Sequence, residues 1–165
     1  MRKPKYLLAI VLVLAWLENA SLPRADASEF EKKSTALMKV LGTKQAFPVP
    51  GAKDAFYSKD AKGKVKAYGV VESGIYPPNC THTWVIGMDA GARVKDIRVL
   101  EMSCPHAFPA KQASFLAQYK GKGPADYEKL KGSVETIAKA TGSCDLTTDA
   151  VKRAIKNVVA ATRKK

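Results

Sequence analysis

The two histidines of the chain each follow a cysteine by two positions, in Cys80-Thr81-His82 and Cys104-Pro105-His106. Thiolate sulfurs and imidazole nitrogens are ligands that zinc and copper accept in tetrahedral sites. In an oxidising compartment, cysteines form disulfides instead, and a third cysteine, Cys144, is also available. Three arrangements stay open: a Cys80–Cys104 disulfide, a Cys104–Cys144 disulfide, or a metal site. The ligands of that metal site would be Cys80, His82, Cys104 and His106.

A second segment that could do chemistry is rich in hydroxyl groups and precedes a predicted helix. Residues 141–148 read Thr-Gly-Ser-Cys-Asp-Leu-Thr-Thr, and apolar residues then recur at helical spacing over 148–163. A loop that enters a helix presents unpaired backbone N–H groups and the positive end of the helix dipole, which together favour phosphate. The candidate ligands are Thr141, Gly142, Ser143, Thr147 and Thr148, with the charge of Lys139 beside them. The alternative is that Thr147 or Thr148 only caps the helix.

The other segments predict the elements that position these residues. In order, they are a helix over 28–41, strands over 55–58, 65–72, 83–88 and 93–102, a short helix over 110–119 and a final helix over 148–163. Turns are predicted over 60–63 and 89–92, and a loop over 73–78. The second turn closes the clearest hairpin, whose open end would bring Cys80 close to Cys104. The order of elements predicts a single α+β domain, with a twisted antiparallel sheet flanked by helices.

The N-terminus has the three parts of a cleavable secretory signal peptide. Arg2, Lys3 and Lys5 give a positive start, 6–17 is apolar, and Ala25-Asp26-Ala27 offers a small-x-small cleavage site. An apolar run of about 12 residues is shorter than the roughly 20 that span a bilayer. Residues 1–27 therefore predict export to the periplasm or another extracytoplasmic space, with an uncleaved membrane anchor as the alternative.

The chain is strongly basic, with a formal net charge of +13. In a cytosolic protein such a charge suggests nucleic-acid binding. Because export separates the protein from nucleic acid, we expect no nucleic-acid partner. The charge fits a lysine-coated soluble surface, or a face for an acidic redox partner or an anionic membrane.

From Phe47 to Ala160 the chain resembles the small FMN-binding domain found in subunits of sodium-pumping and Rnf-type electron-transport complexes and in single-domain periplasmic flavoproteins. Family members read V-D-x-I-S-G-A-T before the last helix, and a flavin transferase joins FMN phosphate to the threonine of that motif. Residues 134–141, Val-Glu-Thr-Ile-Ala-Lys-Ala-Thr, fall on this motif with Ala138-Lys139 in place of Ser-Gly. Residues 115–122 resemble the family's Q-F-x-G-K stretch.

The chain is thus predicted to have three parts: the signal peptide over 1–27, an N-terminal helix over 28–46 and, from the resemblance, an FMN-binding-like domain over 47–165. The resemblance implies an electron carrier rather than an enzyme with its own substrate site. The flavin phosphate would lie at 141–148, either as a phosphoester of Thr141 or without a covalent bond. Trp84, Phe115 or Tyr119 could lie against the flavin ring, or could be core residues.

The same resemblance implies partners. An electron carrier needs a redox partner protein, such as an acidic cytochrome or a membrane electron-transport complex, and covalent attachment needs a flavin transferase. The competing function is an interaction module on the same fold, which is cofactor-free or binds a metal through its Cys and His residues.

Overall fold

The computed structural model describes residues 24–163 of the 165-residue chain. Its internal contacts divide the chain into residues 1–32 and 33–165, with the boundary inside helix α2 (Arg24–Leu41). All strands and the other helices belong to the second unit. The predicted signal peptide lies outside the described residues, except for 24–27, whose backbone begins α2.

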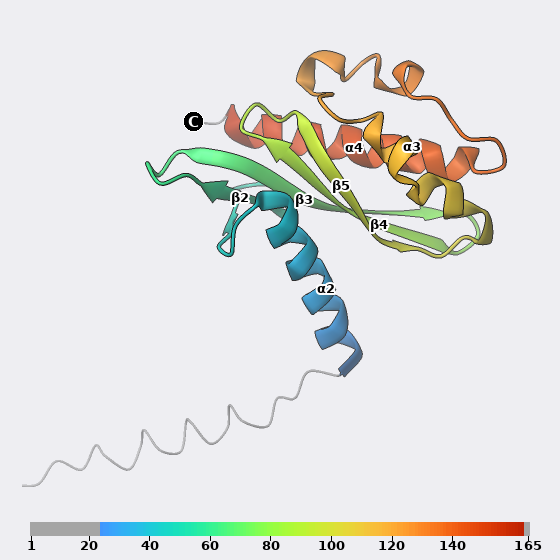
Figure 1. The fold of residues 1–165 in the computed structure, drawn as a ribbon, viewed down its shortest axis with the longest axis horizontal. Coiled ribbons are helices and arrows are strands. Elements are labelled where there is room, and N and C mark those ends of the chain that lie inside the picture. The colour runs from blue at the N-terminus through green and yellow to red at the C-terminus, as the bar shows by residue number, and fades with distance from the viewer. Residues whose placement is uncertain (1–23, 164–165) are drawn as a thin grey trace, which may run out of the picture. The chain divides into compact units, whose positions relative to one another are not determined.

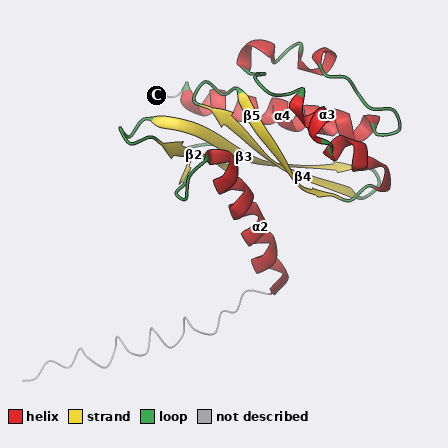
Figure 2. Ribbon diagram, viewed as in Figure 1, coloured by secondary structure: helices red, strands yellow, loops and turns green. Residues whose placement is uncertain are grey.

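The second unit is built on a five-stranded antiparallel sheet (Figures 1 and 2). The strands are β1 (Phe47–Pro48), β2 (Ala55–Lys59), β3 (Val65–Tyr76), β4 (Cys80–Asp89) and β5 (Val94–Met102). Each strand pairs with the next one along the chain, so β5 forms one edge of the sheet. Together with the helices, this sheet confirms the predicted α+β class.

Two aspartates form the two predicted turns. Asp60 Oδ1 accepts hydrogen bonds from the amides of Lys62 and Lys64 at 2.8 and 2.9 Å. Asp89 Oδ1 does the same for the amides two and four residues further on, at 2.8 and 2.9 Å. In both turns the aspartate side chain satisfies backbone N–H groups that would otherwise face solvent, which is why Asp favours such positions.

The predicted loop over 73–78 is wrong for residues 73–76, because β3 continues to Tyr76 and pairs with β4 as far as Cys80; the turn is confined to residues 77–79. Gly74 and the two following prolines suggested a break. In the sheet, a Cβ at Gly74 would lie 3.5 Å from Leu146 and 3.8 Å from the Trp84 ring. The glycine is therefore a strand residue beneath close-packed side chains.

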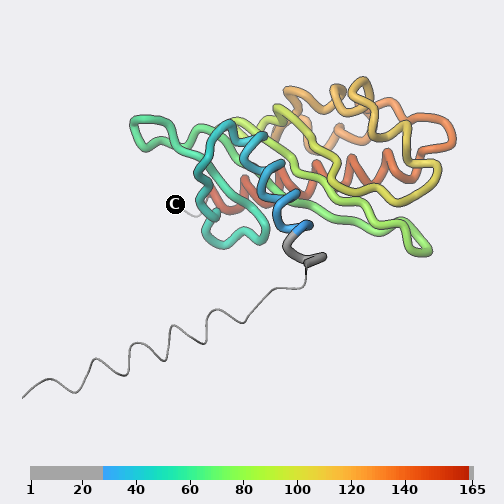
Figure 3. The backbone as a smooth tube through the Cα atoms, turned by 60° about the horizontal axis from the view of Figure 1, so that its bottom comes forward, coloured from blue at the N-terminus to red at the C-terminus, as the bar shows by residue number. Residues whose placement is uncertain are grey.

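The sheet carries a core of buried side chains on each face, and helix α4 (Thr141–Thr162) and the C-terminal part of α2 lie on opposite faces of it (Figures 1 and 3). Helix α4 lies on one face and contributes Val151, Ile155 and Val158 to the larger core. On the other face, Leu37 and Leu41 from the C-terminal part of α2 pack against Val85 and Ala67. The larger core also contains buried residues of β4, β5 and the segment between β5 and α4, among them Trp84, Ile86, Met88, Ile97, Phe115, Tyr119 and Leu130.

A pair of glycines allows α2 to approach the sheet closely. Gly69 of β3 lies directly opposite Gly87 of β4. A Cβ at Gly69 would be 2.6 Å from Leu37 Cδ1, and one at Gly87 would be 2.6 Å from Val40 Cβ. Side chains at these two positions would push the helix away, so the glycines fix the distance between α2 and the sheet.

The connection between β5 and α4 is made of short helical turns. They are the 3-10 helix η1 (Pro105–Lys111), α3 (Ala113–Ala117), η2 (Pro124–Asp126) and η3 (Leu130–Ser133). The predicted helix over 110–119 is thus only partly present, and Pro109 lies within the 3-10 turn before it. Among the described residues, no helix has the length and hydropathy of a membrane span.

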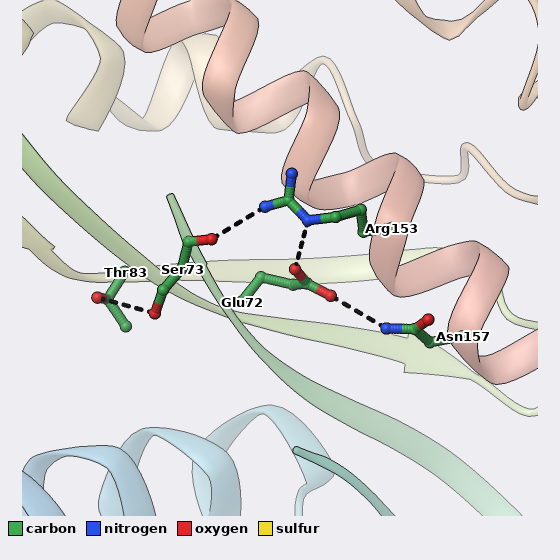
Figure 4. Close-up of polar contacts among 5 residues, drawn as sticks. All are labelled: Glu72, Ser73, Thr83, Arg153 and Asn157. Atoms are coloured by element: carbon green, nitrogen blue, oxygen red, sulfur yellow. Dashed lines mark hydrogen bonds and ion pairs between the residues drawn. The ribbon is translucent and has the colours of Figure 1, made fainter. Parts of the chain in front are cut away.

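A polar cluster holds the middle of α4 on the sheet (Figure 4). Arg153 Nε donates to Glu72 Oε2 at 2.8 Å, and its Nη2 donates to the Ser73 carbonyl at 3.1 Å. Asn157 Nδ2 donates to Glu72 Oε1 at 3.3 Å. Glu72 is 8% exposed. Its burial raises the pKa of the carboxyl, an effect that the hydrogen bond and charge of Arg153 oppose only in part.

Candidate functional site

Helix α4 begins at Thr141, seven residues before the predicted start at 148. Residues 141–148 therefore form its first two turns, and the predicted loop over this segment is wrong. The reason is a buried stripe that continues the helical spacing backwards through Cys144, Thr147 and Thr148 to Ala140. This stripe is not visible in a hydropathy pattern, because threonine counts as a polar residue there. A threonine can nevertheless be buried when its hydroxyl group is hydrogen-bonded, since its methyl group then packs in the core.

The hydroxyls of Thr147 and Thr148 are satisfied inside the helix. Thr147 Oγ1 donates to the Ser143 carbonyl at 2.8 Å, and Thr148 Oγ1 donates to the Cys144 carbonyl at 3.0 Å. Thr148 Oγ1 also lies 2.7 Å from Tyr119 Oη. Both threonines are buried, so neither hydroxyl reaches a ligand at the surface and neither residue caps α4.

Ser143 is bonded to a buried histidine on the neighbouring sheet. Its hydroxyl lies 3.0 Å from His82 Nε2, while His82 Nδ1 lies 3.2 Å from the Cys80 carbonyl. A carbonyl only accepts hydrogen bonds, so Nδ1 carries a proton, and in the neutral ring Nε2 accepts from Ser143. His82 is fully buried. This contact joins the start of β4 to the first turn of α4.

The cysteines form a disulfide between Cys80 and Cys104, with a Cα–Cα distance of 5.1 Å. The hairpin thus brings these two residues together at its open end, as its symmetry predicted. Both sulfurs are in this bond, which excludes the two alternatives left open by the sequence: a metal site of Cys80, His82, Cys104 and His106, and a Cys104–Cys144 disulfide. Among the described residues, no other group of His, Cys, Asp and Glu could hold a metal ion.

Cys144 is the remaining cysteine, and it is a core residue. It is fully buried and carries a free thiol. Burial is the main cause that raises the pKa of this thiol. A thiol that is both inaccessible and hard to ionise is a poor nucleophile.

The N-terminus of α4 has no side-chain cap. Its N-cap residue is Ala140, which has no acceptor to offer, and the first turn holds no acidic residue. The amides of Thr141, Gly142 and Ser143 have no acceptor among the described residues. Thr141 is exposed, and the exposed Lys139 precedes it in a tight turn with a φ of 67°. This end of the helix therefore offers unpaired N–H groups beside a positive charge.

Tyr76 is a residue of this site that the sequence did not reveal. Its ring packs directly on Gly142, where an added Cβ would lie 2.7 Å from Tyr76 Cζ and 2.8 Å from Cδ2. Tyr76 as a residue is 44% exposed, so it can present an aromatic surface beside the free amides. The glycine at the second helical position was the only signal of a close neighbour.

The aromatic residues predicted as candidates for the flavin ring are in the core. Trp84, Phe115 and Tyr119 are at most 1% exposed. The Trp84 indole Nε1 is buried without a hydrogen-bond partner. None of the three can contact a ligand at the surface in this conformation, so Tyr76 is the aromatic side chain that the site offers.

Two cavities lie away from this site. One, of about 530 Å³, lies between η2 and the C-terminal half of α4. The other, of about 390 Å³, lies between β5 and α3. Neither is lined by any residue from 139 to 148.

Comparisons of this chain with protein-family models, with curated proteins and with solved structures find no match.

Proposed function

We propose that this protein is an exported FMN-binding electron-transfer protein, which holds the flavin phosphate at the N-terminus of α4. The observation that carries the proposal is the uncapped start of this 22-residue helix. Three backbone amides there have no acceptor among the described residues, and no carboxylate stands in the first turn to supply one.

The start of α4 lacks both a hydrogen-bond acceptor for its free amides and a negative charge near its positive dipole end, and a bound dianion would supply both. A favourable cap contributes about 1 kcal/mol to a helix, and alanine gives almost none of it. A negative charge at a helix N-terminus contributes a further 0.3–1 kcal/mol or so through the dipole. A phosphate would accept from the free amides and complement Lys139, so it would supply both contributions at once.

The structure reduces the set of residues that can take part. Thr147 and Thr148 leave the proposal because they are buried and satisfied. Ser143 contributes only its amide, because its hydroxyl is bonded to His82. Thr141 is the one predicted hydroxyl that is exposed and has no hydrogen-bond partner within the described chain, so it is the candidate for a phosphoester.

Bound FMN would supply the one- and two-electron chemistry of its isoalloxazine ring. The chain itself would hold the phosphate at Thr141 and Gly142, balance its charge with Lys139 and place the Tyr76 ring beside the flavin. Electrons would come from and go to other proteins, such as an acidic cytochrome or a membrane electron-transport complex.

The proposal is tested on mature protein purified from a host that contains a flavin transferase. We expect absorbance bands of flavin in the near-ultraviolet and blue. If the bond is covalent, the colour stays with denatured protein and the intact mass includes one FMN, and Thr141→Val removes both. The matched control, Thr147→Val, keeps them. Folded protein with no flavin absorbance and no added mass would refute the proposal for covalent FMN, and failure to take up added FMN would refute it entirely.

A second candidate is a cofactor-free interaction module. It is favoured by the Tyr76 ring that already covers Gly142. A colourless protein that stays folded and does not bind FMN would support this function in place of the first.

A further inference from the structure

One edge of the sheet is open to another chain. β5 is the last strand of the sheet and pairs only with β4. On its outer side, Val94 exchanges backbone hydrogen bonds with Gly121 and Lys122, both at 2.8 Å. Beyond Val94, no backbone hydrogen bond joins the outer side of β5 to any other segment of the described chain as far as Met102. An edge of this kind is a template for strand addition.

The smaller cavity runs along this edge. Its β5 wall consists of the five consecutive residues from Val94 to Arg98. Side chains alternate between the two faces of a strand, so a hollow on one face would be lined by every second residue. β5 has a register shift between Val94 and Asp96, and from Asp96 to Arg98 it pairs regularly with β4. Because these three consecutive residues of the regular part line the cavity, it reaches the edge of the strand, where backbone groups are accessible.

Helix α3 forms the opposite wall. The cavity is lined there by Ala113, Leu116 and Ala117 of the helix, by Lys111 at the end of η1 and by Lys120, three residues after α3. The two elements are in contact and lie side by side in Figure 1. This groove between an edge strand and a helix has a volume of about 390 Å³, and a free strand edge beside it is where an extended peptide can add as a further strand.

The charge of this groove is strongly positive. Four cationic residues line it, Lys95, Arg98, Lys111 and Lys120, against the single carboxylate of Asp96. Arg98 Nε is bonded to Asp96 Oδ2 at 2.7 Å, in a pair whose side chains are 42% and 43% exposed. Exposed pairs of this kind are weak, so an arriving carboxylate can compete for Arg98.

We propose that the groove between β5 and α3 binds an acidic, extended segment of a partner protein, which adds to β5 as a further strand. The free backbone edge would supply the main-chain hydrogen bonds, and the four cations would select acidic side chains. This interaction does not depend on flavin binding at α4, since the two sites share no residue.

The test uses a fluorescent peptide of about eight residues that alternates glutamate with valine, a length typical of a strand. Its binding to the full chain is followed by fluorescence anisotropy. We expect saturable binding that weakens when glutamine replaces glutamate. Lys95→Glu with Lys111→Glu should weaken binding by at least about tenfold, because like charges then meet across the groove.

A matched control carries Lys53→Glu with Lys62→Glu, which makes the same change in net charge outside the cavity. This variant should keep its affinity within about twofold, and circular dichroism should show both variants folded. Equal losses in the two variants would overturn the proposal, since general attraction to a basic protein would then explain the binding.

Peptides methylated on alternate backbone nitrogens test strand addition itself. Methylation of the amides that face β5 should abolish binding, while methylation of the other set should be tolerated. If neither set matters, the peptide is held by charge alone and does not form a strand. The proposal also fails if inorganic phosphate or free glutamate displaces the peptide at equal concentration, because the groove is then a site for small anions.

Discussion

Arg153 links the middle of α4 to the sheet through the buried carboxylate of Glu72. We predict that Arg153→Met lowers the free energy of unfolding by about 2 kcal/mol near pH 7. Methionine keeps much of the apolar stem of arginine but removes its donors to Glu72 and to the Ser73 carbonyl. The Glu72 carboxylate, 8% exposed, would then keep only the 3.3 Å bond from Asn157.

The magnitude follows from the exposure of the two partners. Breaking a fully buried ion pair costs about 3–5 kcal/mol, because a charge stays buried without its partner. The Arg153 side chain is 43% exposed, so water can enter the space that the guanidinium group leaves and partly solvate the Glu72 carboxylate. We therefore expect a cost below that range. The cost should fall as the pH approaches 4 or so, because protonation removes the charge on Glu72 that Arg153 stabilises.

The assay is urea unfolding followed by circular dichroism, with two further variants. Arg153→Met combined with Glu72→Gln should recover most of the loss, because no charge is then buried without a partner. Arg98→Met removes the exposed pair with Asp96 and should cost at most about 0.5 kcal/mol. If Arg153→Met costs no more than Arg98→Met near pH 7, or if the double variant is no better than the single one, the reasoning about a buried carboxylate is refuted.

Three further predictions follow from burial and close packing. The Cys144 thiol should resist a thiol reagent in the folded protein and react as one thiol per chain in urea without reductant, since Cys80–Cys104 is a disulfide; rapid labelling of the folded protein would contradict this. The raised pKa of Glu72 in the folded protein means that ionisation of this carboxyl disfavours folding. The Glu72→Gln variant should therefore become more stable relative to wild type as the pH rises from about 4 to 7, which urea titrations of both proteins would measure. Gly87→Val should destabilise the fold by about 1–3 kcal/mol in thermal unfolding through overpacking against Val40, whereas an unchanged melting temperature would show that α2 can move.

Local chemistry was enough to predict the hairpin and what it brings together. The signals that predict it are local: an aspartate at each turn, strands rich in β-branched residues, and Cys80 and Cys104 placed almost symmetrically about the second turn. The resulting sheet and the disulfide are found in the structure. The pattern of Ala150, Val151 and Ala154 likewise predicted the body of the last helix.

The site itself could not be predicted in the same way, because it depends on which hydroxyls are buried. A threonine scores as polar in the sequence, yet Thr147 and Thr148 lie in the core with their hydroxyls bonded back to the helix. This extends the helix to Thr141 and leaves Ala140 at its cap. The contact between Tyr76 and Gly142 joins segments that are far apart in the chain, so no local sequence pattern predicts it.

The central claim is that phosphate at the start of α4 holds the flavin, and a comparison of FMN with riboflavin tests it most directly. Mature protein is titrated with each, and binding is read from flavin fluorescence, with Lys139→Glu alongside and Lys62→Glu as the control. We predict saturable binding of FMN, at least about tenfold weaker binding of riboflavin, and a loss of this preference in Lys139→Glu alone. Equal affinity for FMN and riboflavin, or no binding of either by folded protein, would contradict the claim.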